Sequence, residues 1–97
     1  MFTGTLVADF RLGDVHSLKD KRSVVRPIIA ELRRRFDVAA SEVGEQDLHR
    51  RVAVGVATVA GDAARVGVVL DSCERMLAGR PEVELLSTQR RLIGPND

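Results

Sequence analysis

The order in which the hydrophobic period changes along this chain limits its fold more than any other feature. An apolar residue at every second position indicates a strand with one buried face, whereas a recurrence every three to four positions indicates a helix. Residues 2–12 show the first pattern and residues 18–36 the second. The complete order is strand, helix, strand, strand, helix, strand, over residues 2–12, 18–36, 37–43, 51–60, 62–78 and 82–92.

This order predicts an α+β fold, a ferredoxin-like βαββαβ sandwich. Two strand–helix–strand units with right-handed crossovers place four strands in one antiparallel sheet, with both helices on one face. The first and third strands should be central, which suits the Val- and Ala-rich residues 51–60. The adjacent Leu85 and Leu86 interrupt the alternation of the last strand and indicate either a β-bulge or burial on both faces. We expect one domain over residues 1–93 and a loose tail at 94–97.

The start of the first helix carries a capping signal and its middle carries a conflict. Ser17 followed three residues later by Asp20 is typical of a helix N-cap. Pro27 lacks the backbone N–H that would bond to Ser23, so a helix that begins at Leu18 should bend there. The alternative is a short turn over residues 18–22 and a second helix start capped by Ser23. The sequence leaves both open.

Composition excludes several classes of protein. The chain has 97 residues, a 44% hydrophobic share and only three aromatic residues, all Phe, so its core must be aliphatic. The single cysteine, Cys73, cannot form an internal disulfide and suits a reducing compartment. No apolar run approaches the roughly 20 residues of a membrane span, and the N-terminus has no signal-peptide pattern. We therefore expect a cytoplasmic protein with no membrane association.

The predicted topology brings three basic segments to one end of the sheet. These are the start of the first helix, the connection between the second and third strands, and the turn after the second helix. Cations at a helix start oppose the helix dipole, but together with free N–H groups they can bind phosphate. The candidate phosphate-binding residues are His16, Ser17, Lys19, Lys21, Arg22, His49, Arg50, Arg51 and Arg80.

Other observations weaken the case for a phosphate site at this end of the sheet. Asp14, Asp20, Glu45 and Asp47 share it, and the net charge of the whole chain is only +1. Only 2 of the 15 basic residues are lysine, a bias that a GC-rich genome also produces. The same side chains can equally extend into water without a ligand. Two histidines without further ligands do not make a metal site, and we expect neither a metal nor another cofactor.

Several motifs resemble a known family. His-Ser-Leu-Lys-Asp-Lys-Arg-Ser at 16–23, Arg-Phe-Asp-Val at 35–38, Glu42-Val43 leading to Asp47-Leu48, and the Gly-Val-Ala strand at 55–57 are similar to the YlxP-like family of small bacterial proteins of unknown function. The resemblance covers nearly the whole chain. It implies a ferredoxin-like fold, a cytoplasmic location and an association with translation or ribosome maturation. It implies no catalytic residues.

The leading functional hypothesis is a non-enzymatic RNA-binding or ribosome-associated protein. Lys21, Arg22 and Arg50 are expected to contact backbone phosphates, with Lys19 and His49 at the edges. A structured RNA or a ribosomal subunit suits the chain better than single strands, because residues 51–60 offer no aromatic ring on which a base could stack. We expect no DNA partner.

Two alternatives come from other classes of protein. The first is a protein-interaction module or homodimer. It associates through an open sheet face that includes Ala53, Gly55 and Ala57 if their valine neighbours face the helices. The second is an enzyme of the acylphosphatase type, which shares this topology. The turn at residues 12–16 lacks the glycine-rich phosphate loop that such an enzyme needs, and no catalytic set of residues is recognisable.

Overall fold

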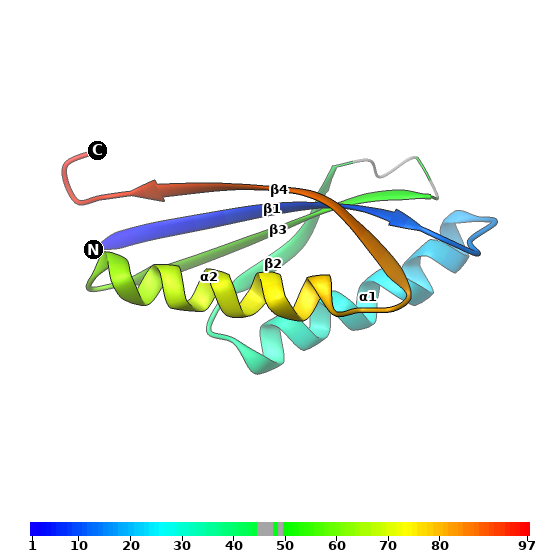
Figure 1. Ribbon diagram of the computed structural model, residues 1–97, viewed down its shortest axis with the longest axis horizontal. Helices are drawn as coiled ribbons and strands as arrows, with labels where there is room; N and C mark the ends of the chain where they lie inside the picture. Colours follow the sequence, from blue (N-terminus) through cyan, green and yellow to red (C-terminus); the bar gives the residue numbers. More distant parts are fainter. Residues whose placement is uncertain (45–47, 49) are drawn as a thin grey trace.

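The computed structural model describes residues 1–44, 48 and 50–97 and confirms the predicted fold class. Four strands form one antiparallel sheet, and both helices lie on the same face of it (Figure 1). The elements are β1 (Phe2–Leu12), α1 (Leu18–Arg35), β2 (Ala39–Gly44), β3 (Arg51–Ala60), α2 (Ala63–Ala78) and β4 (Val83–Ile93). Strand β2 begins two residues later than expected because a turn follows the helix, in which Val38 N–H donates to the Phe36 carbonyl.

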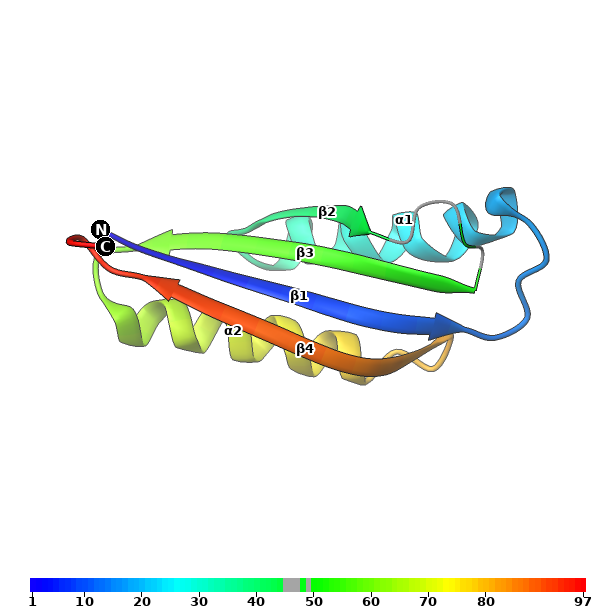
Figure 2. The same ribbon diagram turned by 90° about the horizontal axis from the view of Figure 1, so that it is seen from above.

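The strand order is β2-β3-β1-β4, so the first and third strands are central as predicted (Figure 2). The β1–β4 register passes from Asp9 opposite Ser87 to Phe10 opposite Leu85. Leu86 is the additional residue, which confirms the predicted bulge. A second shift, between Glu42 and Gly44 on β2, was not foreseen.

Helix α1 begins at Leu18 and continues through Pro27 to Arg35. Ser17 is its N-cap, because the side-chain oxygen accepts a 3.1 Å hydrogen bond from Asp20 N–H. Ser23 is not a second cap. Its hydroxyl donates to the Lys19 carbonyl one turn earlier. The helix is therefore continuous from Leu18, and the split at residues 18–22 is wrong.

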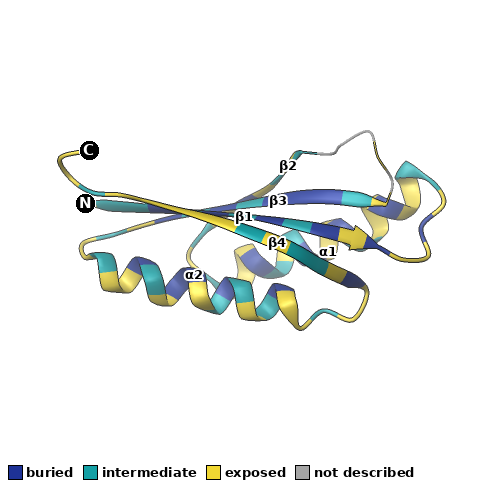
Figure 3. Ribbon diagram, turned by 45° about the horizontal axis from the view of Figure 1, so that its top comes forward, coloured by how far each residue is buried: buried dark blue, intermediate teal, exposed yellow. Residues whose placement is uncertain are grey.

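The core lies between the sheet and the two helices (Figure 3). Val52, Val54 and Val56 of β3 belong to it, so the residues between them point to the opposite face of the sheet. Burying a side chain such as Phe10 contributes about 1.5–3 kcal/mol. Helix α2 lies close against the sheet at Gly4, where a β-carbon would collide with Val66.

Candidate nucleic-acid interface

The segment before α1 is held by its own acidic residues. His16 Nε2 lies 2.8 Å from Asp14 Oδ1, and His16 N–H donates to the Asp20 carboxylate. Ser17 already accepts from Asp20 N–H as the helix cap. An acid in the first turn is what the helix dipole favours. Ser17 and the helix start therefore serve to begin α1, which does not support the expectation that free N–H groups here form a phosphate site.

Lys21 does not lie on the surface. It is 2% exposed, and its ammonium group lies 2.9 Å from Glu42 Oε1 of β2. It also donates a 2.8 Å hydrogen bond to the Leu48 carbonyl. The expectation that Lys21 contacts a phosphate is corrected by this placement, because a buried ion pair holds its charge inside the protein. Its structural effect is to tie the beginning of α1 to the end of β2.

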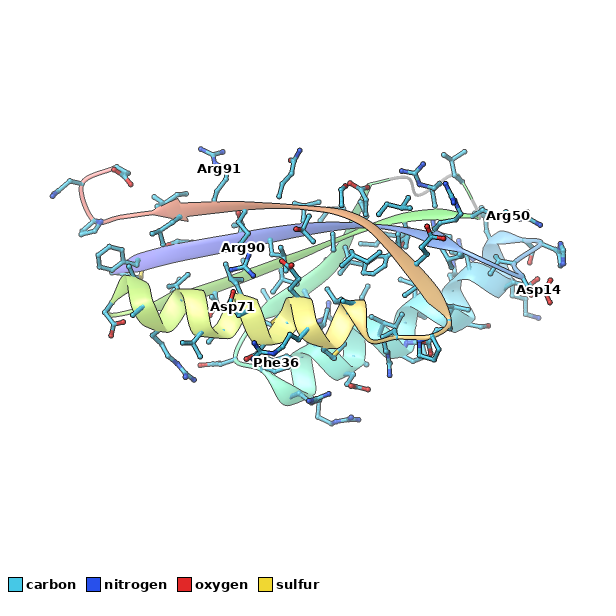
Figure 4. All side chains as sticks on the ribbon, viewed as in Figure 1. Asp14, Phe36, Arg50, Asp71, Arg90 and Arg91 are labelled. Atoms are coloured by element: carbon cyan, nitrogen blue, oxygen red, sulfur yellow. The ribbon has the colours of Figure 1, made fainter. Side chains whose placement is uncertain are left out.

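The connection that leads into β3 reaches the start of α1 as predicted. Leu12 N–H donates to the Arg50 carbonyl, and Arg50 Nε donates to the Val15 carbonyl at 3.4 Å. Figure 4 shows Arg50 and Asp14 at the same end of the molecule. Arg51 is half-buried within β3, opposite Arg11 of β1. His49, Glu45 and Asp47 lie outside the described residues.

Arg80 does not join the other predicted site residues. Its guanidinium is 3.2 Å from Glu31, and its Nε is 3.6 Å from Glu82. Glu31 lies 13 residues after Leu18 in α1, about 20 Å farther along the helix axis at 1.5 Å per residue. The turn after α2 thus meets the later half of α1, because α2 is shorter than β4 and ends before the sheet does. The prediction that Arg80 lies beside Lys19 and Arg22 is wrong.

Arg26, and not Arg80, lies beside Lys19 and Arg22. Lys19, Arg22 and Arg26 recur at three- and four-residue intervals on the exposed side of α1 and line one shallow depression with Ser23 and Pro27. Within residues 1–44, 48 and 50–97 no acid pairs with any of these three cations. We call Lys19, Arg22 and Arg26 the α1 cationic strip. Arg26 was missed as a site residue, although its spacing from Arg22 is visible in the sequence.

The later half of α1 differs in its electrostatics. Glu31 lies among Arg34, Arg35 and Arg80, at 4.0, 3.0 and 3.2 Å respectively. The hydrogen bond from Arg35 holds the pKa of the Glu31 carboxyl below its ordinary value, and the charges of the three arginines act in the same direction. These arginines are partly neutralised and less available to an anion.

The described residues contain no group of three or more His, Cys, Asp or Glu side chains that could hold a metal ion. Cys73 is buried in α2, and burial raises the pKa of its thiol. A thiol with a raised pKa is a weak nucleophile. Across the same part of the chain, neither helix has the length and apolar character to span a membrane.

Comparison with known proteins gives the family. Residues 3–90 match the model of a family described as "Protein of unknown function (DUF503)". The chain belongs to this family. The uncharacterised protein YlxP of Bacillus subtilis (strain 168) is 32% identical over 76 residues, covering 78% of this chain and 83% of that protein. The family resemblance drawn from residues 16–23 and 35–57 is therefore confirmed.

One solved structure supports the fold, and a second has a lower TM-score. A de novo designed protein with a ferredoxin fold has a TM-score of 0.57 at 13% identity, covering 97% of this chain and 87% of that one. The N63A mutant of SnoaB, a cofactor-independent oxygenase from Streptomyces nogalater, has a TM-score of 0.48 at 16% identity. The match covers 98% of this chain and 94% of that one. At these identities the likeness concerns the path of the chain and not its chemistry.

Proposed function

We propose that this protein is a non-enzymatic, cytoplasmic RNA-binding protein that contacts structured RNA or a ribosomal subunit through the α1 cationic strip. The observation that carries the proposal is that Lys19, Arg22 and Arg26 are exposed together on one helix face and are not paired with an acid of the described residues. Three free cations at this spacing match the phosphates of a nucleic-acid backbone.

The neighbouring residues extend this surface. Arg50 lies at the same end of the molecule, where its guanidinium is tied to the Val15 carbonyl by one long hydrogen bond of 3.4 Å. His16 is exposed beside Asp14, so its contribution is small while the acid remains next to it. The proposal therefore gives the main role to the strip, a supporting role to Arg50, and none to Lys21 or Arg80.

The absence of aromatic side chains from the open sheet face favours structured RNA. Two of the three phenylalanines, Phe2 and Phe10, alternate with the open-face residues of β1, and Phe36 follows α1. Proteins that read single strands stack bases on exposed aromatic rings. A helical array of cations, in contrast, reads the spacing of phosphates in a folded RNA.

The test compares two variants with equal changes of charge. Arg22→Glu/Arg26→Glu inverts two charges of the strip, and Arg65→Glu/Arg75→Glu inverts two exposed arginines of α2 as a control. The probes are purified ribosomal subunits, folded ribosomal RNA and an unstructured single strand, titrated across a salt series. We expect the strip variant to lose about tenfold or more in affinity near 0.1 M salt, and the log–log salt slope to fall by about 2.

The control variant should bind like the parent. A parent protein that binds none of the probes at about 50 mM salt removes the proposal, because phosphate contacts are strongest at low ionic strength. Equal losses in both variants would show a nonspecific effect of net charge and would also overturn it.

A further inference from the structure

The face of the sheet opposite the helices is uncovered and contains an apolar groove. No described element lies over it except the end of β2, which rises above the plane of the sheet (Figure 1). The groove has a volume of about 630 Å³. Its lining on this face comes from three strands: Thr5, Val7, Ala39, Ser41, Val43, Gly55 and Ala57.

The groove owes its shape to small residues and to the β2 bulge. Gly55 and Ala57 of β3 leave the floor low, because neither projects far from the sheet. At the bulge Val43 turns over Gly55, where an added β-carbon would lie 2.8 Å from Val43 Cγ1. Val43 is 55% exposed and Val59, at the other end of β3, is 58% exposed. Two exposed valines thus stand on either side of a floor of small residues.

The edges of the sheet are less suited to a partner than its face. Arg33 Nε donates a 3.0 Å hydrogen bond to the Ala40 carbonyl of the edge strand β2, which has six residues. The other edge, β4, contains the Leu86 bulge and the adjacent cations Arg90 and Arg91. Short strands, bulges and cations are the features that keep edge strands from pairing with another chain.

The charges on the open face suit a second copy of the same chain. Two acids, Asp9 and Glu84, and two arginines, Arg11 and Arg51, lie on it, and Arg11 pairs with Glu84 at 3.7 Å. Arg91 adds a cation on this side, whereas Arg90 turns to the helices and pairs with Asp71 (Figure 4). Among the described residues, Arg33 is the one charged residue that lines the groove, and its guanidinium donates to the Ala40 carbonyl. Two acids against three arginines leave this face close to neutral, so two copies repel each other less across it than across two α1 cationic strips.

The available area also suits such a pairing. At about 3.3 Å per residue and about 4.8 Å between strands, the four strands cover roughly 600 Å². Stable specific interfaces bury about 600–1,000 Å² on each partner. Small residues such as Gly55 and Ala57 allow a second sheet to approach to the usual spacing of about 10 Å.

We infer that the protein is a homodimer in which the open sheet faces of two copies pack against each other, with Val43 of each copy against the floor of the other's groove. This arrangement leaves all four helices on the outside. The α1 strips then lie on opposite outer sides of the dimer and stay accessible. The dimer does not depend on the RNA-binding proposal, and its test uses no RNA.

The experiment measures mass against concentration by sedimentation equilibrium. Val43→Lys and Val59→Lys, separately and together, place a charge on the open face, the first at the groove and the second farther along β3. Val68→Lys on the exposed side of α2 is the matched control, since Val68 is 54% exposed. All three valines are on the surface, so the variants should fold, which circular dichroism verifies.

We expect the parent to sediment at about twice the 10.6 kDa of one chain at micromolar concentration. The Val43→Lys/Val59→Lys variant should show a dimer dissociation constant raised by about 30-fold or more, because two lysines on each partner lose their hydration in the interface. Val68→Lys should match the parent. A monomeric parent at about 100 μM, or a dimer that persists in the double variant, overturns the inference.

Discussion

The two halves of α1 carry the same kind of side chain in opposite electrostatic settings. In the first half, Lys19, Arg22 and Arg26 face water without an acidic partner among the described residues. In the second half, Arg34 and Arg35 share Glu31 with Arg80 from the turn after α2. The contrast shows that the abundance of arginine says little about binding until the acids around each arginine are placed.

The first half of α1 also contains one cation that is buried. Lys21 lies between Lys19 and Arg22 in sequence, but points into the protein and pairs with Glu42. One short segment thus supplies both a structural cation and a set of surface cations. Substitutions that separate these roles test the comparison.

Replacing Lys21 should produce the largest loss of stability. Lys21→Met leaves the half-buried Glu42 without its cation and the Leu48 carbonyl without its donor, which should cost about 3 kcal/mol in the free energy of unfolding. Lys19→Met, two residues away and exposed, should change it by less than about 0.5 kcal/mol. Urea denaturation measures both.

A double variant sharpens this prediction. Lys21→Met/Glu42→Leu removes both charges of the pair and should recover much of the loss, because replacing both partners of a buried ion pair by apolar side chains is often nearly neutral. Equal stabilities of Lys21→Met and Lys19→Met would contradict the buried pair. They would also restore Lys21 as a candidate for phosphate contact.

Replacing Glu31 should change how stability depends on pH. The folded-state pKa of Glu31 lies below its ordinary value of 4.5, so its stabilising effect is complete above that value and is lost as the pH falls through the folded pKa. Glu31→Gln should be less stable than the parent at pH 7 and should lose less stability on acidification. Denaturant titrations at pH 7 and at about pH 3 measure this difference.

Glu84→Gln is the control for the loss of one carboxylate. Glu84 is exposed on β4 and pairs only with Arg11 among the described residues. If the free energy of unfolding depends on pH in the same way for Glu31→Gln and the parent, the ion pairs of Glu31 with its arginines do not stabilise the fold. The contrast between the two halves of α1 would then be wrong.

The smallest effect is expected from the strip itself. Arg26→Gln should change the free energy of unfolding by less than about 0.5 kcal/mol, because Arg26 is exposed and has no ion pair with any described residue. Arg35→Gln should be the more destabilising of the two, since Arg35 hydrogen-bonds Glu31 and lies over the Phe36 ring. Thermal denaturation of the two variants side by side compares them. A larger loss for Arg26→Gln would indicate that the strip is structural.

Local pattern was sufficient for the order of the elements. The alternation in residues 2–12 follows from steric preferences that act over a few residues, whereas the start of α1 and the Leu85-Leu86 pair each left two interpretations open. The position of Lys21 could also have been read from the sequence. It lies four residues before Val25, on the same helical face as the apolar residues of α1. A lysine is ordinarily expected on an exposed face, and for this reason Lys21 was assigned to the surface.

Other features depended on residues that are distant in sequence. Asp71 has Arg75 one turn later and would be expected to pair with it, but it pairs with Arg90 of β4 at 2.8 Å. Arg80 reaches Glu31 rather than the start of α1 because α2 is about two turns shorter than the strands it packs beside. Relative lengths of packed elements do not appear in any local pattern.

The sequence by itself determined the order of elements, the fold class, the family and the presence of a basic helix start, because each of these follows from local periodicity or from a contiguous motif. Only the tertiary structure decided which basic residues are free. A cation is available for a phosphate when no acid lies within about 4 Å of it, and that distance is fixed by how strands and helices far apart in the chain are packed together.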